Sequence, residues 1–174
     1  MSTCLTHTEE YIKTFYLKLG ISTPQQLQFQ TITRRLGITS FYWQEPSQAL
    51  FTGKRSIILL NENLSPQQQW QEFCHELTHV LLHTGRQTKL PKLFVEYQEY
   101  KADHFMYHAA IPTFMLDQLL IYNFDIITVY NVQELFNVEY DFALKRLHQY
   151  VNTKNNMLKW NSQSDSIKLG RRIS

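Results

Sequence analysis

The motif His75-Glu76-Leu77-Thr78-His79 constrains this chain most strongly, because its chemistry requires a helix. Two histidines four residues apart lie one turn above each other on one helical face, within reach of the same metal ion. A glutamate directly after the first histidine is placed to act on a water bound to that metal. This H-E-x-x-H arrangement is typical of zinc peptidases, in which the glutamate is the general base. We therefore predict that His75 and His79 bind the metal and that Glu76 is catalytic.

The residues around the motif predict a helix over residues 66–83. Ser65 and Pro66 are typical of an N-cap and of a first helical position, and Gly85 follows the expected end. At about 100° per residue, the apolar side chains fall on one arc, and the histidines and Glu76 fall on the other. The apolar arc consists of Trp70, Phe73, Cys74, Leu77, Val80 and Leu81. Such a helix buries one face in a core and presents the other to a cleft.

A catalytic zinc with three protein ligands needs one more side chain and keeps a position for water. We prefer Glu99, which follows His79 on a second expected helix over residues 92–110. Glu96, about one turn earlier, is the competing ligand. Asp103, one turn after Glu99, is expected to accept a hydrogen bond from the far ring nitrogen of a ligating histidine, which fixes the tautomer. The alternative for Asp103 is a carboxylate on the helix surface.

A tetrahedral intermediate also needs a hydrogen-bond donor for its oxyanion besides the metal. The sequence offers several donors near the expected ligands and does not choose among them. These candidates are His83, Tyr97, Tyr100, His104, Tyr107 and His108. His83 is not expected to be a metal ligand. The motif H-E-x-x-H-x-x-G-x-x-H would need a glycine at Leu82 and a histidine at Gly85.

The stretch from Ile57 to Pro112 resembles the ImmA/IrrE family of metallopeptidases. The resemblance rests on segments 57–61, 73–83, 99–105 and 109–112. Thr78 stands where the family usually has glycine and Met106 where it usually has alanine, but neither difference removes an expected ligand. The resemblance implies a zinc-dependent, site-specific endopeptidase. It also implies the substrate, a helix-turn-helix repressor of a prophage or other mobile element, whose cleavage lifts repression.

Two other functions stay open from the sequence. One is a non-proteolytic module that binds the repressor or DNA and uses the metal for structure or sensing. The other is a component of a toxin–antitoxin pair. The intact Glu76 favours an enzyme, because a structural metal site has no use for a general base. The formal net charge of +2 is too small to argue for direct contact with DNA.

The length and composition predict one globular α+β domain over residues 1–152, with 174 residues and 43% hydrophobic content. We expect a core over 37–112, a helical cap over 113–152, and a mobile, basic, polar tail over 153–174. No signal peptide or long apolar run is apparent, so we expect a cytoplasmic protein without a membrane partner.

The elements before the motif are expected to be two helices, over 8–20 and 24–36, followed by short strands within 38–61. A three-stranded, mostly antiparallel sheet packed with helices is the simplest interpretation. Peptidases of this shape place an edge strand beside the cleft, where an extended substrate adds through main-chain hydrogen bonds. The turn at Asn137-Val138 resembles half of a helix-turn-helix, and we interpret it as part of the cap.

Overall fold

The computed structural model describes residues 5–52, 55–82, 90–119 and 126–170, with side chains as far as residue 156. The fold is α+β, as the sequence predicts. Its first part contains α1 (His7–Lys18), the 3-10 helix η1 (Pro24–Gln26), α2 (Phe29–Leu36), β1 (Thr39–Trp43), β2 (Gln48–Thr52) and β3 (Arg55–Asn61). Its second part contains α3 (Pro66–Leu82), α4 (Lys92–Ala110), α5 (Thr113–Leu116), the 3-10 helix η3 (Asp117–Leu119), α6 (Ile126–Phe136) and α7 (Tyr140–Gly170).

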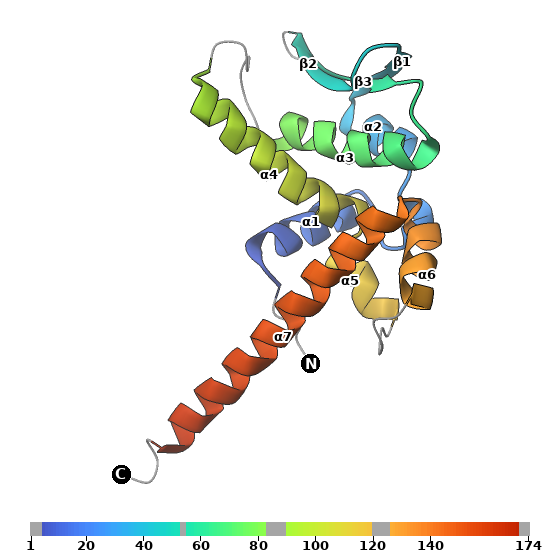
Figure 1. Cartoon of the computed structure of the whole chain (residues 1–174). Helices are drawn as coiled ribbons and strands as arrows, with labels where there is room; N and C mark the ends of the chain where they lie inside the picture. The colour runs from blue at the N-terminus through green and yellow to red at the C-terminus, as the bar shows by residue number, and fades with distance from the viewer. Residues whose placement is uncertain (1–4, 53–54, 83–89, 120–125, 171–174) are drawn as a thin grey trace.

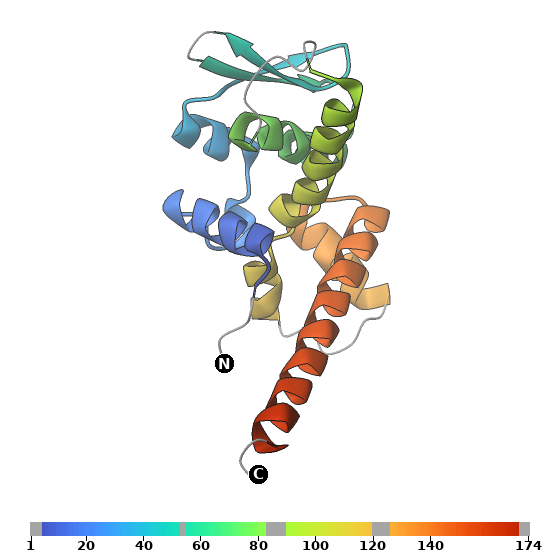
Figure 2. The same ribbon diagram turned by 90° about the vertical axis from the view of Figure 1, so that its left-hand side faces the viewer.

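The elements form layers, in which α2 and α3 lie beneath the sheet and α1, α5, α6 and α7 lie on the other side of α3. Figure 1 shows the sheet at one end of the molecule, α3 beneath it, and α4 crossing α3. Figure 2 shows the same layers from the side, with α7 leading away from the sheet. Within the described part of the chain, every helix is too short or too polar to cross a bilayer.

The sheet is mixed, in the order β1-β3-β2, where the sequence favours an antiparallel arrangement. β1 runs parallel to β3, and β2 runs antiparallel to it. The connection from β1 to β2 crosses the end of β3. There the Ser47 hydroxyl accepts a hydrogen bond from the Asn61 N–H (3.1 Å), and the Trp43 carbonyl accepts one from the Glu62 N–H (2.8 Å). This crossing places β2 on the far side of β3.

The register centres on Ile58, which pairs with Ser40 of β1 and with Ala49 of β2. Ile58 and Leu60 are buried in the core that also receives the apolar arc of α3. The central strand is therefore the most buried one, and β1 and β2 are the edges. Of the two edges, β2 packs on the motif helix, which meets the expectation of an edge strand near it.

The motif helix α3 begins as predicted, with a reciprocal cap. The Ser65 hydroxyl accepts from the Gln68 N–H (3.2 Å), and the Gln68 side-chain oxygen accepts from the Ser65 N–H (3.1 Å). The preceding helix differs from the prediction over 24–36, because η1 and α2 are separate. The Gln26 side chain accepts the N–H groups of Ser22 and Thr23 and closes η1 on itself, after which Leu27 packs against the core.

The C-terminal helices form a cap held against α3. Asn137 adopts a left-handed conformation (φ 51°) between α6 and α7, which asparagine tolerates better than most residues. Two residues further on, the carboxylate of Glu139 accepts hydrogen bonds from the side-chain amides of Gln68 (2.9 Å) and Gln71 (3.0 Å). The N–H of Glu139 donates to the side-chain oxygen of Gln71 (2.8 Å). The turn that resembles a helix-turn-helix thus packs on the motif helix. The sequence predicts a mobile tail from residue 153, but the backbone of α7 stays helical as far as Gly170.

A buried polar cluster joins α1, α4, α5 and α7 below the sheet layer. Arg146 donates to the Ile111 carbonyl (3.1 Å) and to the Thr113 hydroxyl (2.7 Å), and Thr113 donates in turn to Glu9. Glu9 Oε1 lies 4.0 Å from Arg146 Nη2 and 3.9 Å from His108 Nδ1. We call Glu9, His108, Thr113 and Arg146 the junction cluster. It connects the C-terminal half of α4 to the first helix, α1, and to the last helix, α7.

Candidate metal centre

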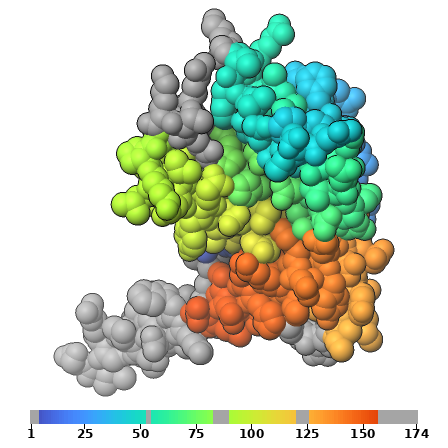
Figure 3. Space-filling view, turned by 45° about the horizontal axis from the view of Figure 1, so that its top comes forward, coloured from blue at the N-terminus to red at the C-terminus, as the bar shows by residue number. Residues whose placement is uncertain are grey.

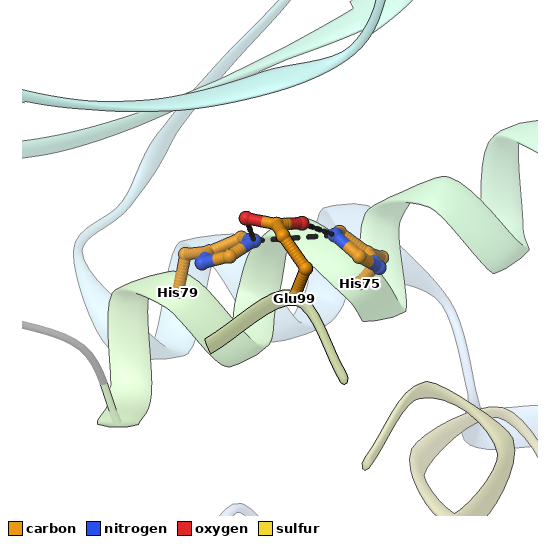
Figure 4. Close-up of side chains that lie close together, drawn as sticks. All are labelled: His75, His79 and Glu99. Carbon is orange, nitrogen blue, oxygen red and sulfur yellow. Dashed lines mark hydrogen bonds and ion pairs between the residues drawn. The ribbon is translucent and has the colours of Figure 1, made fainter. Parts of the chain in front are cut away.

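Two helices bring together the three side chains that the spacing singles out. His75 and His79 project from α3, and Glu99 projects from α4, which packs across it (Figure 4). His75 Nε2 lies 3.1 Å from His79 Nε2 and 3.2 Å from Glu99 Oε2, and His79 Nε2 lies 3.7 Å from Glu99 Oε1. One ligand atom from each residue lies within 4.8 Å of the others. The three residues therefore form a candidate metal site.

The separations fit an ion at the centre of these atoms. Two ligands about 2.0–2.1 Å from one tetrahedral ion lie about 3.3 Å apart, which is close to the observed 3.1–3.7 Å. The donor set, two imidazoles and one carboxylate, is one that catalytic zinc sites use. Glu96 has a different partner, because it forms an ion pair with Lys92 along α4 (3.7 Å).

Asp103 lies on the far side of the His75 ring. Its Oδ1 is 3.1 Å from His75 Nδ1, while Nε2 of the same ring faces Glu99. A neutral imidazole carries one N–H, so donation from Nδ1 to Asp103 leaves the lone pair of Nε2 free for a metal. The structure thus places Asp103 beside the far ring nitrogen, where the sequence analysis expects it.

Glu76 is buried, although it belongs to the polar arc of α3. Its residue is 7% exposed, and burial raises the pKa of its carboxyl group to about 7. The neighbouring His75 and a hydrogen bond with the Ala49 backbone act in the opposite direction and lower the pKa. Burial is the largest effect, so the side chain is poised to take up and release a proton near neutrality.

The contact with Ala49 identifies β2 as the edge beside the site. Ala49 pairs with Ile58, yet its backbone bonds to Glu76, so its main-chain groups point away from β3. Main-chain groups alternate in direction along an antiparallel pair, so those of Phe51, two residues on, point the same way. Sequence reasoning missed Ala49, and no side-chain signal could reveal it, because every residue except proline carries an N–H.

The expected oxyanion donors lie in different surroundings. Tyr97, Tyr100 and His104 are exposed on α4. Tyr107 stacks on Phe142 of α7 at 4.3 Å, and His108 belongs to the junction cluster. His83 lies outside the described residues. Among the candidates that the structure describes, Tyr97, Tyr100 and His104 are therefore accessible, and Tyr107 and His108 are engaged in contacts within the domain.

Comparison with known proteins adds to this geometry. Residues 33–148, which include every residue of the candidate site, match the family model of the IrrE N-terminal-like domain of peptidases. The chain belongs to this family. The match confirms the resemblance seen in the motif segments, and the family supports a metal-dependent, metallopeptidase-type function.

Two relatives of the IrrE N-terminal-like family come from Bacillus subtilis (strain 168). The chain is 37% identical to the phage-like element PBSX protein XkdA over 155 residues, covering 88% of this chain and 78% of that protein. It is 33% identical to the uncharacterized protein YqaB over 144 residues, covering 83% of this chain and 84% of that protein. A solved Mycobacterium tuberculosis transcriptional regulator has a similar fold, with a TM-score of 0.54 and 14% identity. That likeness covers 82% of this chain, which spans 56% of the regulator, and it concerns the fold alone.

Proposed function

We propose that this chain is a zinc-dependent, site-specific endopeptidase that cleaves a helix-turn-helix repressor of a phage-like element. The observation that carries the proposal is the position of Glu76. A buried carboxyl group with a pKa of about 7 stands next to a candidate metal ligand and touches the open edge of a sheet. A metal site that served only structure would not need such a group.

The proposed ligands are His75, His79 and Glu99. Zinc is our choice of metal, because it ranks high in affinity for nitrogen and oxygen donors and suits this set. When bound, zinc would activate a water molecule and polarise the carbonyl of the scissile peptide bond. Asp103 has the role of a positioning residue, since its carboxylate holds the His75 ring in the tautomer that presents Nε2.

Glu76 acts as general base and then as general acid. Its carboxylate accepts the proton of the attacking water and delivers it to the leaving amine of the cleaved peptide bond. In the metal-free chain, burial raises the pKa of this carboxyl group to about 7, so it exchanges a proton near neutral pH. Burial beneath β2 shields this exchange from bulk water.

The free edge of β2 is suited to bind an extended substrate. The main-chain groups of Phe51 and the carbonyl of Ala49 point away from β3 and are available to pair with a peptide laid along the edge, while the Ala49 N–H donates to Glu76. A chain paired there would pass directly beside Glu76, which contacts Ala49. The fold thus supports cleavage of an extended segment within a protein.

The choice of a repressor as substrate rests on the family and on the relative from a phage-like element. The test is co-expression with the repressor-like protein encoded beside this gene, using the natural chain and the Glu76→Gln variant in parallel. A single cut that appears only with the natural chain supports the proposal, and sequencing of the new terminus gives the site. A repressor that stays whole with both chains contradicts it, and co-purification of that whole repressor would favour a non-proteolytic binding module.

A further inference from the structure

We infer that the outer face of α4 is a docking site for an amphipathic helix of the protein substrate, beside the catalytic centre. This inference rests on the proposed function and extends it from the scissile bond to the substrate's folded part. The face is formed by Leu93, Tyr97, Tyr100 and His104, which we call the α4 stripe. Figure 3 shows the N-terminal half of α4 standing at the surface of the molecule, beside the sheet.

The first three residues of the α4 stripe are large hydrophobic side chains that water reaches. Leu93 is 80% exposed, Tyr97 is 55% exposed and Tyr100 is 67% exposed. Single exposed apolar residues are normal on a protein surface, but a contiguous row marks a site of interaction. The core contacts of α4 come from a different face, which includes Gln98, Ala102, Phe105 and Ala109. The stripe is therefore not needed to hold α4 in the domain.

The spacing of the stripe matches a helical partner. Its four positions follow the intervals 4, 3 and 4, the pattern that forms a seam between two packed helices. They extend over three turns of α4, or about 17 Å. A partner helix with apolar residues at the same intervals would bury this row, whereas an extended strand would present every second residue to it.

The charges beside the stripe favour an apolar partner. Lys92 forms an ion pair with Glu96 on α4 (3.7 Å), and Lys101 Nζ lies 5.5 Å from the centre of the Tyr97 ring. These charged groups have partners on their own helix. The stripe therefore offers its apolar surface rather than an unpaired charge as the main source of affinity.

The position of the stripe favours the substrate over a second copy of this chain. Tyr100 directly follows Glu99, and His104 directly follows Asp103, so the stripe and the candidate site share one helix. Glu99 and Asp103 have side chains that are 42% and 63% exposed. A helix docked on the stripe lies beside these two residues, which a substrate has to reach and a second copy of this chain does not.

The first experiment measures cleavage kinetics with the full chain and the neighbouring repressor-like protein. A variant with Leu93→Ser, Tyr97→Ser and Tyr100→Ser should raise KM by about tenfold or more, because docking energy is lost. Tyr97 and Tyr100 are also candidate oxyanion donors, so its KM is compared with that of a chain that lacks the same two hydroxyls. A second variant with Tyr97→Phe and Tyr100→Phe keeps the rings and is expected to restore tight binding. The matched control replaces Ile127 and Tyr130, two exposed apolar residues of α6, by serine. An unchanged KM in the stripe variant, or an equal rise in the control, overturns the inference.

The second experiment detects binding of the repressor-like protein to the stripe without requiring cleavage. A photo-crosslinking amino acid replaces Tyr97, or Tyr130 as control, in the Glu76→Gln chain, which is then irradiated with the same repressor-like protein. Crosslinks from position 97 to a helix of that protein, and none from position 130, support the inference. Crosslinks between two copies of this chain, equal crosslinking at both positions, or no crosslink at 97 overturn it. If the natural chain leaves the repressor whole, the proposed function fails, and this experiment still decides the inference.

Discussion

His75 Nδ1 lies 3.1 Å from Asp103 Oδ1, across the packing of α3 against α4. The other nitrogen of the same ring lies 3.2 Å from Glu99 Oε2. One imidazole thus connects two carboxylates that are one turn apart on α4. The orientation of His75, and with it the shape of the candidate site, depends on how α4 is seated on α3.

Removal of the Asp103 carboxylate is expected to weaken metal binding while leaving the fold intact. Asp103→Ala should lower zinc affinity by about 10–100-fold, because His75 loses the acceptor that fixes its tautomer. The side chain is 63% exposed, so the free energy of unfolding of the metal-free protein should hardly change. Competition with a chromogenic chelator measures the affinity. Equal affinity in both proteins would reduce Asp103 to a surface carboxylate.

The ligand assignment predicts which residues the metal content depends on. His75→Ala, His79→Ala and Glu99→Ala should each lose stoichiometric zinc, because two remaining ligands hold the ion weakly. Glu96→Ala is the matched control, since Glu96 is bound to Lys92 and should not affect the metal. Atomic emission on purified protein gives the metal per chain. Full occupancy in any of the three variants would remove that residue from the set.

Glu76→Gln should separate metal binding from turnover. The amide has nearly the size of the carboxyl group but cannot accept the proton of the attacking water, so the cleavage rate should fall by about 10²–10⁴-fold. Zinc content should stay at the natural level, because Glu76 is not one of the three grouped ligands. Single-turnover cleavage of the repressor-like protein is the measurement. Normal turnover would exclude Glu76 as the base.

The motif helix α3 and its partner α4 are predictable from local signals. The Ser65 cap and the apolar arc predict α3 over 66–83, and the structure has it from Pro66 to Leu82. The H-E-x-x-H and E-x-x-x-D spacings single out the residues that α3 and α4 bring together. These spacings are informative because a helix converts sequence intervals directly into a shared face.

The arrangement of the sheet is not predictable in this way. Alternation along β1 and β2 indicates strands but not their neighbours, and the crossing at Ser47 depends on a hydrogen bond to distant Asn61. The Ala49 contact with Glu76 is likewise invisible, since it uses a main-chain N–H. The junction cluster is a third case, because Glu9 and Arg146 read as surface charges until four helices enclose them.

Arg146 is expected to be a large contributor to stability. It is fully buried, and burial lowers the pKa of its guanidinium to about 10, so it stays charged at neutral pH. Arg146→Met should cost about 3–5 kcal/mol of unfolding free energy, because Glu9 is left buried without its cation. Urea denaturation measures the loss, with Lys18→Met as control, because Lys18 is exposed at the end of α1. Adding Glu9→Gln should recover part of it, and no recovery would contradict the pairing.

His108 should make stability depend on pH below neutrality. Burial, with Arg146 and His104 nearby, lowers its pKa to about 2, against about 6.5 in an unfolded chain. Between these values the unfolded state binds a proton that the folded state does not, so this contribution to stability is present above pH 6.5 and is lost as the pH falls.

The loss is at most about 1.4 kcal/mol per pH unit, or about 2 kcal/mol between pH 6.5 and 5. Urea denaturation at pH 7 and pH 5 should therefore show a steeper fall for the natural chain than for His108→Gln, which cannot be protonated there. The two chains have the same carboxylates, so comparing them removes the contribution of those groups to the pH dependence of stability. The exceptions are groups that lie next to the substituted ring, namely Glu9, Arg146 and His104. Equal slopes in the two chains would mean that His108 accepts its proton in the folded state, and that the junction cluster opens to water without unfolding.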